Sequence, residues 1–310
     1  MKVALYRAKL RAQRAAKDVV GKIVGPVAIG ALHLARKFDP DKSARLFGAV
    51  ARKFGPRFPE QRIGRDNLTA AFPEKSSDEI EAILSGVWDN LGRSAAEFAH
   101  LDSVWDYDVE HPERSRIEVT GRSLELFEKL RDDGKPALIF ASHLGNWELP
   151  AVAAVAHGLD TAVLYRRPNI EAADRIVEEI RSVKMGQLVA AGSSAPFKLA
   201  QALQDGKHVG MLIDQHFTKG VDVTFFGRTA KANPLLAKLL RQIECPLHGA
   251  RVIRLPDGRF RAELTEEIEP VRDADGRIDI QGTMQACTSV IESWIRETPE
   301  QWLWLHRRWR

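Results

Sequence analysis

The sequence predicts an α/β fold built on a largely parallel, mixed sheet flanked by helices. From about residue 116 onward, short apolar runs typical of buried strands alternate with segments whose apolar residues recur at helical spacing. Residues 249–255 and 259–265 flank a Pro-Asp-Gly turn, which predicts a hairpin and an antiparallel edge. With 310 residues, the chain is long enough for one large domain of this kind or two small ones.

The elements of this fold are expected in a definite order. Residues 39–60 carry three prolines, which should interrupt regular structure between the N-terminal segment and the rest. A helix over 76–99 is indicated by a cap at Ser76 or Ser77, acidic residues in the first turn and apolar residues at helical spacing. Further helices are expected at 124–130, 147–157, 170–183, 195–205, 233–243 and 281–297, and strands at 137–141, 161–165, 187–191, 208–213 and 221–226. Sites in such sheets form beyond the carboxyl ends of the strands.

The N-terminal segment is basic and then apolar. Residues 1–22 contain seven basic side chains and one acid, and they run into the apolar stretch Val19–Ala35. A membrane-spanning helix needs about 20 mostly apolar residues, and this stretch is interrupted by a lysine, a proline and a histidine. A short anchor with its basic flank on the cytoplasmic side, a helix in the membrane interface and an ordinary buried helix all stay open. We therefore divide the chain into a helical membrane-associating segment, 1–40, and a main domain, 41–310.

Charge and motif content narrow the function. The formal net charge is only +4, but basic residues cluster at both ends, which indicates an anionic partner. Three of the seven tryptophans lie beside the C-terminal arginines, a combination that suits a membrane interface. The two cysteines show no metal-ligand spacing, and the sequence has no zinc, nucleotide-binding or nucleic-acid-binding signature. We expect no metal, no organic cofactor and no nucleic acid partner.

One motif carries candidate chemistry. The strand at 137–141 is followed by His143 and, five residues later, Glu148. On one helix these two would lie on nearly opposite sides, at about 100° per residue. Asn146 suits an N-cap and Pro150 a first turn, so we expect His143 on a loop and Glu148 in the first helical turn. Glu148 would then bond one imidazole nitrogen while the other faces a bound hydroxyl, as in a general base. The spacing alone also fits a structural histidine and glutamate.

The segment SHLGNWEL resembles the H-x-x-x-x-D/E motif of glycerolipid and lipid A acyltransferases, in particular the lipid A biosynthesis lauroyl/myristoyl acyltransferase family. Segments that resemble the family occur in order over most of the chain, at Arg65–Leu68, Phe72–Glu74, Tyr165–Pro168, Asp214-Gln215, Phe225–Gly227 and Gln301–Arg308. The resemblance implies a glycerolipid-acyltransferase-like fold at the cytoplasmic face of the inner membrane. It further implies transfer of an acyl chain from acyl carrier protein to a hydroxyl of an anionic, Kdo-bearing lipid A precursor, without a cofactor.

Other site residues are expected beside this motif. Arg166 and Arg167 follow a strand, where one would bind the thioester oxyanion and the other a phosphate, unless both form a solvated turn. We also expect substrate contacts from Asn146, Asp214, Gln215, Phe225, Phe226 and Arg228. Asp214 and Gln215 would shape the acceptor site or simply end a strand, whereas the two phenylalanines would line an acyl groove or pack in the core.

Two other functions stay open at this point. The same His143 and Glu148 chemistry suits a different phospholipid or glycolipid acceptor, such as a mannosylated, glycerol-based or ornithine lipid. A non-catalytic lipid-binding protein at the membrane surface would also use basic ends. Substituting His143 by alanine separates these classes, because a pure binding protein keeps its function.

Overall fold

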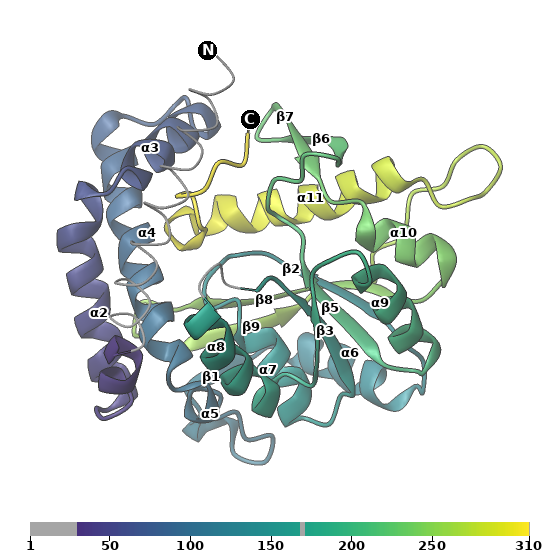
Figure 1. Ribbon diagram of the computed structural model, residues 1–310, viewed down its shortest axis with the longest axis horizontal. Helices are drawn as coiled ribbons and strands as arrows, with labels where there is room; N and C mark the ends of the chain where they lie inside the picture. Colours follow the sequence, from purple (N-terminus) through teal and green to yellow (C-terminus); the bar gives the residue numbers. More distant parts are fainter. Residues whose placement is uncertain (1–29, 168–170, 310) are drawn as a thin grey trace, which may run out of the picture.

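The computed structural model of the chain describes residues 30–167 and 171–309. Its centre is a seven-stranded sheet with the strand order β1-β9-β8-β2-β5-β3-β4 (Figure 1). Strands β2, β3, β4, β5 and β8 are parallel, and β9 pairs antiparallel with β8. The predicted mixed sheet with its hairpin is therefore confirmed. The strands are β1 (Ile117–Val119), β2 (Leu138–Ala141), β3 (Thr161–Tyr165), β4 (Gln187–Ala190), β5 (His208–Leu212), β8 (Leu247–Arg254) and β9 (Phe260–Leu264).

Helices cover both faces of this sheet (Figure 1). One face carries α6 (Gly121–Asp132), α7 (Leu149–Ala156) and α8 (Glu171–Lys184), and the other carries α9 (Ala195–Gln204), α10 (Leu235–Gln242) and α11 (Ile280–Glu297). Successive side chains of β2 point to opposite faces of the sheet, as in any strand. Phe140 stacks on Trp294 of α11, whereas Ile139 and Ala141 face the α7 side.

The N-terminal helices form a group beside the sheet, with α4 between α2 and the strands (Figure 1). They are α2 (Pro40–Phe54), α3 (Glu60–Ala71), α4 (Ser77–Phe98) and the short α5 (Leu101–Val104). The predicted capped helix is confirmed as α4, since Ser76 and Glu79 form a capping box.

The prediction that prolines interrupt structure throughout 39–60 is wrong. Pro40 opens α2, where a missing N–H breaks no helical bond, and the side chain of Asp39 caps the helix by accepting from Lys42 N. The other two prolines lie in a single 3₁₀ turn (Gly55–Arg57) and at the start of α3. The prolines therefore lie at the starts of successive helices and do not interrupt any of them.

The remaining predicted elements are present with ends shifted by a few residues. The strand expected at 221–226 is β6 (Val221–Phe225), but it lies outside the main sheet, in a hairpin with β7 (Arg228–Ala232) that the sequence did not indicate. Within the described residues, no helix has the length and apolar character needed to cross a membrane. Most of the predicted membrane-associating segment lies outside those residues.

Candidate active site

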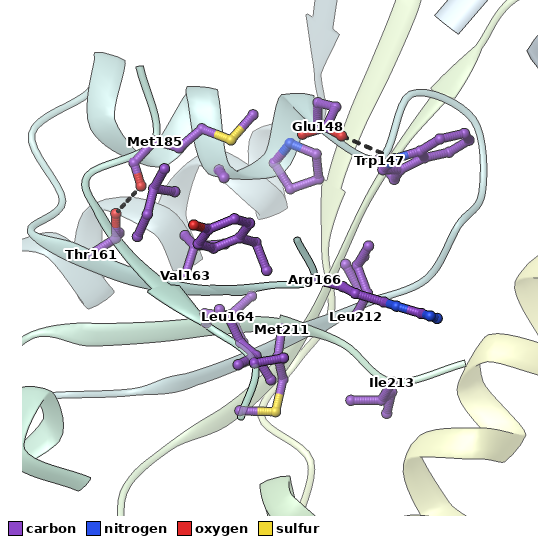
Figure 2. A pocket seen from close by; sticks show the side chains of 18 of the residues that line it. Trp147, Glu148, Thr161, Val163, Leu164, Arg166, Met185, Met211, Leu212 and Ile213 are labelled. Atoms are coloured by element: carbon purple, nitrogen blue, oxygen red, sulfur yellow. Dashed lines mark hydrogen bonds between the residues drawn. The ribbon is translucent and has the colours of Figure 1, made fainter. Parts of the chain in front are cut away.

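The carboxyl ends of three neighbouring parallel strands meet at one cavity of about 680 Å³. His143 follows β2, Arg166 follows β3, and Gln215 follows β5, and all three line it. Figure 2 shows Glu148 and Trp147 at the start of α7 on one side of this cavity and Arg166 extending from the end of β3. The site thus lies where a parallel sheet of this kind is expected to bind ligands.

The carboxylate of Asp214 holds both the ring and the backbone of His143. The imidazole Nδ1–H donates to Asp214 Oδ1 over 2.7 Å, and the backbone N–H of His143 donates to Oδ2 over 2.8 Å. Trp302 Nε1–H donates to the same Oδ2 over 2.8 Å. The Asp214 side chain is fully buried, whereas that of His143 is 15% exposed. The pair is therefore rigid on the carboxylate side and open on the imidazole side.

This pairing sets the protonation behaviour of the imidazole. Burial alone would lower the pKa of His143, but the charge and hydrogen bond of Asp214 outweigh it and the pKa is raised. The pKa of Asp214 is lowered, because its contacts with His143 outweigh the effect of burial. With Nδ1–H given to a carboxylate that stays ionised, Nε2 carries the lone pair. The amide nitrogen of Gln215 lies 3.2 Å from Nε2, at the place where a substrate hydroxyl would bind.

The loop that carries His143 is held by three separate parts of the chain: α4, β8 and the C-terminal segment. Gly145 N–H donates to Gln301 O, and Gly145 O accepts from Asn90 and Ser94 of α4. Leu303 N–H donates to His143 O. Gly145 has a φ of 59°, and a Cβ there would lie 2.1 Å from the carbonyl oxygen of Val252 on β8. Only glycine fits this turn, which brings the loop against β8 and aims His143 at the cavity.

Comparison with known proteins identifies the family. The family model described as bacterial lipid A biosynthesis acyltransferase matches residues 21–310. The chain belongs to this family. It is 24% identical over 272 residues to the lipid A biosynthesis myristoyltransferase of Escherichia coli (strain K12), covering 87% of this chain and 80% of the relative. The lipid A biosynthesis acyltransferase 1 of Shigella flexneri gives the same identity and coverage.

In this family member, the expected bond between Glu148 and the imidazole is absent, because the Glu148 carboxylate pairs with Arg181. Glu148 is the N-cap of α7 and not a residue of its first turn. Its carboxylate forms an ion pair with the Arg181 guanidinium of α8, with contacts of 2.5 and 3.0 Å. Asp214 occupies the Nδ1 side because β5 lies directly beside β2. Glu148 still lines the cavity, and its charge is among the causes that raise the pKa of His143.

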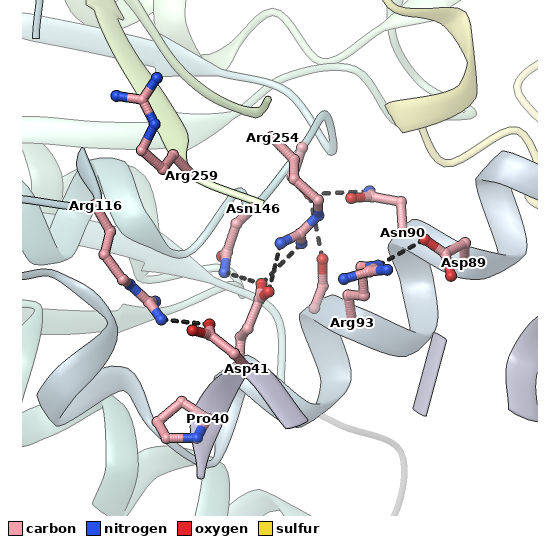
Figure 3. Close-up of polar contacts among 12 residues, drawn as sticks. Pro40, Asp41, Asp89, Asn90, Arg93, Arg116, Asn146, Arg254 and Arg259 are labelled. Atoms are coloured by element: carbon pink, nitrogen blue, oxygen red, sulfur yellow. Dashed lines mark hydrogen bonds and ion pairs between the residues drawn. The ribbon is translucent and has the colours of Figure 1, made fainter. Parts of the chain in front are cut away.

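Asn146 supports the loop from behind and lies outside the cavity, where we had expected a substrate contact. It is buried, its Oδ1 accepts from Glu148 N–H, and its amide nitrogen donates to Glu97 over 2.8 Å. Glu97 also pairs with both Nη atoms of Arg254 on β8, over 2.5 and 2.9 Å. Figure 3 shows Asn146 and Arg254 turned toward each other beside α4. This buried network of hydrogen bonds and ion pairs fixes the position of the α7 N-terminus, although Arg254 Nε has no partner within it.

Of the two fates expected for Phe225 and Phe226, an acyl groove or the core, the structure shows the core. Both are buried in a cluster with Trp302, Trp304 and Trp309, and Arg228 lies 4.7 Å from the centre of the Trp309 ring. The acyl-groove role is therefore wrong for these phenylalanines, and the cavity does not involve Arg228. The same cluster buries Trp302 and Trp304 completely, so these two do not form the interfacial belt that their neighbouring arginines suggested.

The two consecutive arginines differ in position. Both side chains are exposed, and Arg166 lines the cavity. Successive residues at a strand end point to opposite faces, so the expectation that one of the pair reaches the reacting carbonyl stays with Arg166. Its cationic guanidinium suits an oxyanion or a phosphate.

Most of the cavity wall could not be predicted from the sequence. The apolar lining comes from strands β2 to β5 with the residue after β5, and from the residue that follows α8, namely Ile139, Val163, Leu164, Met185, Leu188, Met211, Leu212 and Ile213. Such residues are indistinguishable from core residues by local pattern. Arg181 and Trp302 were missed because their partners are distant in sequence. Among residues 30–167 and 171–309, no group of His, Cys, Asp or Glu side chains is placed to hold a metal ion.

Proposed function

We propose that the protein transfers a fatty acyl chain from acyl carrier protein to a hydroxyl of a Kdo-bearing lipid A precursor. Membership of the lipid A biosynthesis acyltransferase family supports acyl transfer in this pathway. The observation that carries the mechanism is the His143–Asp214 pair, whose Nε2 lies beside the Gln215 amide at a cavity with largely apolar walls. Donor, acceptor and a glycerolipid-acyltransferase-like fold are parts of the proposal.

The reaction needs one base and no enzymic nucleophile. His143 Nε2 takes the proton of the acceptor hydroxyl as its oxygen attacks the thioester carbonyl. Asp214 stabilises the imidazolium that forms and keeps Nδ1 protonated. Collapse of the tetrahedral intermediate breaks the C–S bond, and the imidazolium returns its proton to the departing thiolate. The products are the acylated lipid and the free thiol of the carrier.

The cavity suits both the apolar acyl chain and the polar reacting groups of the proposed substrates. Its volume is in the range of sites for drug-sized ligands, and its strand-derived walls are apolar where an acyl chain would lie. Arg166 at the rim would hold the oxyanion or an acceptor phosphate. Glu148 is proposed to act as the second carboxylate of the site, holding Arg181 against the cavity and favouring protonation of His143.

We place this chemistry at the cytoplasmic face of the inner membrane. The basic and apolar segment 1–40 would associate with the membrane, and 41–310 would form the acyltransferase domain. The physical reason is that both the acceptor and the product are lipids, whereas the proposed carrier is soluble. A membrane-associated enzyme meets both.

Mass spectrometry of lipid A from cells with and without the gene tests the proposal. Loss of one acyl chain in the deletion, restored by the wild-type gene and not by His143→Ala, is the expected result. The purified protein should also use acyl carrier protein thioesters with a lipid A precursor in preference to phospholipid acceptors. Restoration by a folded His143→Ala variant would instead indicate a non-catalytic lipid-binding protein, and transfer to phospholipids alone would indicate a different acceptor.

A further inference from the structure

Helix α2 carries an apolar stripe that faces outward. Leu46, Val50 and Phe54 are four residues apart, so they lie on one face of the helix, and their exposed fractions are 58%, 48% and 47%. A different face of α2, with the buried residues Ala44 and Gly48, packs against α4. The exposed stripe is therefore not the packing face of an ordinary amphipathic helix.

The exposure is concentrated in one region of the chain. Eleven large hydrophobic side chains are exposed among the described residues, and six of them fall between residues 34 and 58. Leu34 and Phe38 precede α2, and Phe58 follows it. Single exposed hydrophobic residues are normal, but a contiguous group marks an interaction surface.

Cations accompany this stripe. Lys42 and Lys53 lie four residues before Leu46 and three after Val50, on the same side of the helix. The Lys53 ammonium and the Arg57 guanidinium lie 5.7 and 5.2 Å from the centre of the Phe54 ring. Within the described part of the chain, neither forms an ion pair with an acidic side chain. Arg57 donates to the carbonyl oxygen of Lys53, and it is Arg52 that pairs with Asp89 of α4. The sequence before α2 adds seven basic residues and one acid in 1–22.

We propose that this α2 surface, formed by Leu34, Phe38, Leu46, Val50, Phe54 and Phe58 with Lys42, Lys53 and Arg57, binds the headgroup region of an anionic lipid bilayer. An apolar stripe with lysine and arginine beside it is the pattern of a helix that lies in the membrane interface. A symmetric contact with a second copy would bring the same cations toward one another. Anionic headgroups neutralise them while the stripe enters the acyl boundary.

The surface is distinct from the cavity but connected to it through one helix. α2 packs on α4, and Asn90 and Ser94 of α4 hold the carbonyl of Gly145 in the loop that carries His143. α4 thus lies between the lipid contact and the catalytic loop (Figure 1). The inference goes beyond the proposed reaction, because it rests on exposure and charge and not on His143.

A polarity-sensitive fluorophore on the full-length chain tests this surface. Val50→Cys receives the label, and Val109→Cys is the matched control, since both valines are 48% exposed. The native thiols are poor competitors at neutral pH, because burial raises the pKa of Cys245 to about 11 and that of Cys287 to about 12. The probe surface is vesicles of phosphatidylglycerol mixed with phosphatidylcholine, with pure phosphatidylcholine for comparison.

We expect a blue shift at position 50 with anionic vesicles, quenching by spin-labelled acyl chains, and neither effect at position 109. Replacing Lys53 and Arg57 by glutamine should raise the half-maximal lipid concentration by up to about thirtyfold, since each cation near an anionic surface contributes about a factor of five. Glutamine at the exposed Lys135 and Lys238 is the control and should change little.

Four results would overturn the proposal. The emission of the label at position 50 could remain that of a probe in water while the protein sediments with vesicles, or it could shift equally with neutral and anionic lipid. The emission could shift without lipid as the protein concentration rises, which indicates contact with a second copy. It could also be blue-shifted without lipid at every protein concentration, which indicates that the chain itself covers the surface. Acyl transfer by the same labelled protein to detergent-dispersed acceptor is measured separately, so failure of the proposed reaction is distinguished from failure of the membrane surface.

Discussion

Replacing Asp214 by asparagine tests which carboxylate orients the base. The Asp214 carboxylate accepts from His143 Nδ1–H, His143 N–H and Trp302 Nε1–H. Asparagine offers a single oxygen and adds an NH₂ donor. The orientation that costs least keeps the oxygen on His143 N–H and Trp302 Nε1–H and places the NH₂ against His143 Nδ1, which loses its acceptor. The geometry of the ring is then kept, but the tautomer with a free Nε2 is no longer favoured.

The size of the loss follows from these contacts. General-base assistance contributes about 10² to 10⁴ in rate, and the wrong imidazole tautomer in the Ser-His-Asp triad costs about 10⁴. We therefore expect Asp214→Asn to lower kcat by about 10² to 10⁴. Steady-state kinetics with a lipid A precursor and acyl carrier protein thioester measures it, with circular dichroism to show that the variant is folded.

The pH profile adds a readout that a loss of stability does not produce. Because the base must be neutral, kcat/KM should fall as pH drops through the raised pKa of His143. Without the negative charge of Asp214, burial dominates, and the inflection should move to lower pH.

A double-mutant comparison separates Asp214 from Glu148. On a His143→Ala background, Asp214→Asn should cost almost nothing more, because residues that act as a unit are non-additive. Glu148→Gln should keep a measurable cost on the same background, because it also holds Arg181. Near-normal kcat in a folded Asp214→Asn protein, or full additivity with His143→Ala, would refute the assignment of Asp214 as the orienting group.

Three further predictions concern residues around this pair. Trp302→Phe keeps a buried ring but removes one donor to Asp214; we expect kcat to fall about tenfold, equivalent to about 1.4 kcal/mol, and the pH inflection to rise, which a pH–rate profile would show. Gly145→Ala should lower the free energy of unfolding by more than about 2 kcal/mol, because the new Cβ meets Val252 O. Gly134→Ala, at a positive φ but in open space, should lower it by only about 1 kcal/mol. Denaturant unfolding of both variants measures the difference. Arg166→Ala should lower kcat by about 10² to 10³, while Arg167→Ala should be mild or raise KM for the acceptor, and equal effects in varied-acceptor kinetics would contradict this division.

The sequence predicted the sheet and the position of His143 after a strand, because both depend on local patterns. A short apolar run before His143 and a helix start after it place the imidazole at a strand end. Asp214 was expected near the acceptor and not on the imidazole. Its role depends on the order of strands, which places β5 next to β2 although the sequence separates them by two other strands. Local periodicity holds no information on that order.

Other differences between expectation and structure have equally local causes. The local sequence around Phe225 and Phe226 fits a groove lining and a core position equally well. They lie in the core because tryptophans of the distant C-terminal segment pack against them. Pro40 was interpreted as a breaker, although the same residue is well placed at the first position of a helix. Position along an element, and not residue type, decides what such residues do.

The charges around His143 explain why two carboxylates occupy one site. With a neutral imidazole, the negative charges are those of Glu148, which lines the cavity, and of Asp214, which is buried behind His143. They are matched by the positive charges of Arg181 and Arg166 in the cavity wall. When His143 takes the hydroxyl proton, the site gains one positive charge while the thioester carbonyl becomes an oxyanion. The new charges balance each other within the cavity, so the transition state needs no reorganisation of solvent around a net charge. In the proposed mechanism, Asp214 would face the imidazolium and Arg166 would face the oxyanion. Glu148 keeps Arg181 from adding a second, uncompensated cation beside the protonated base.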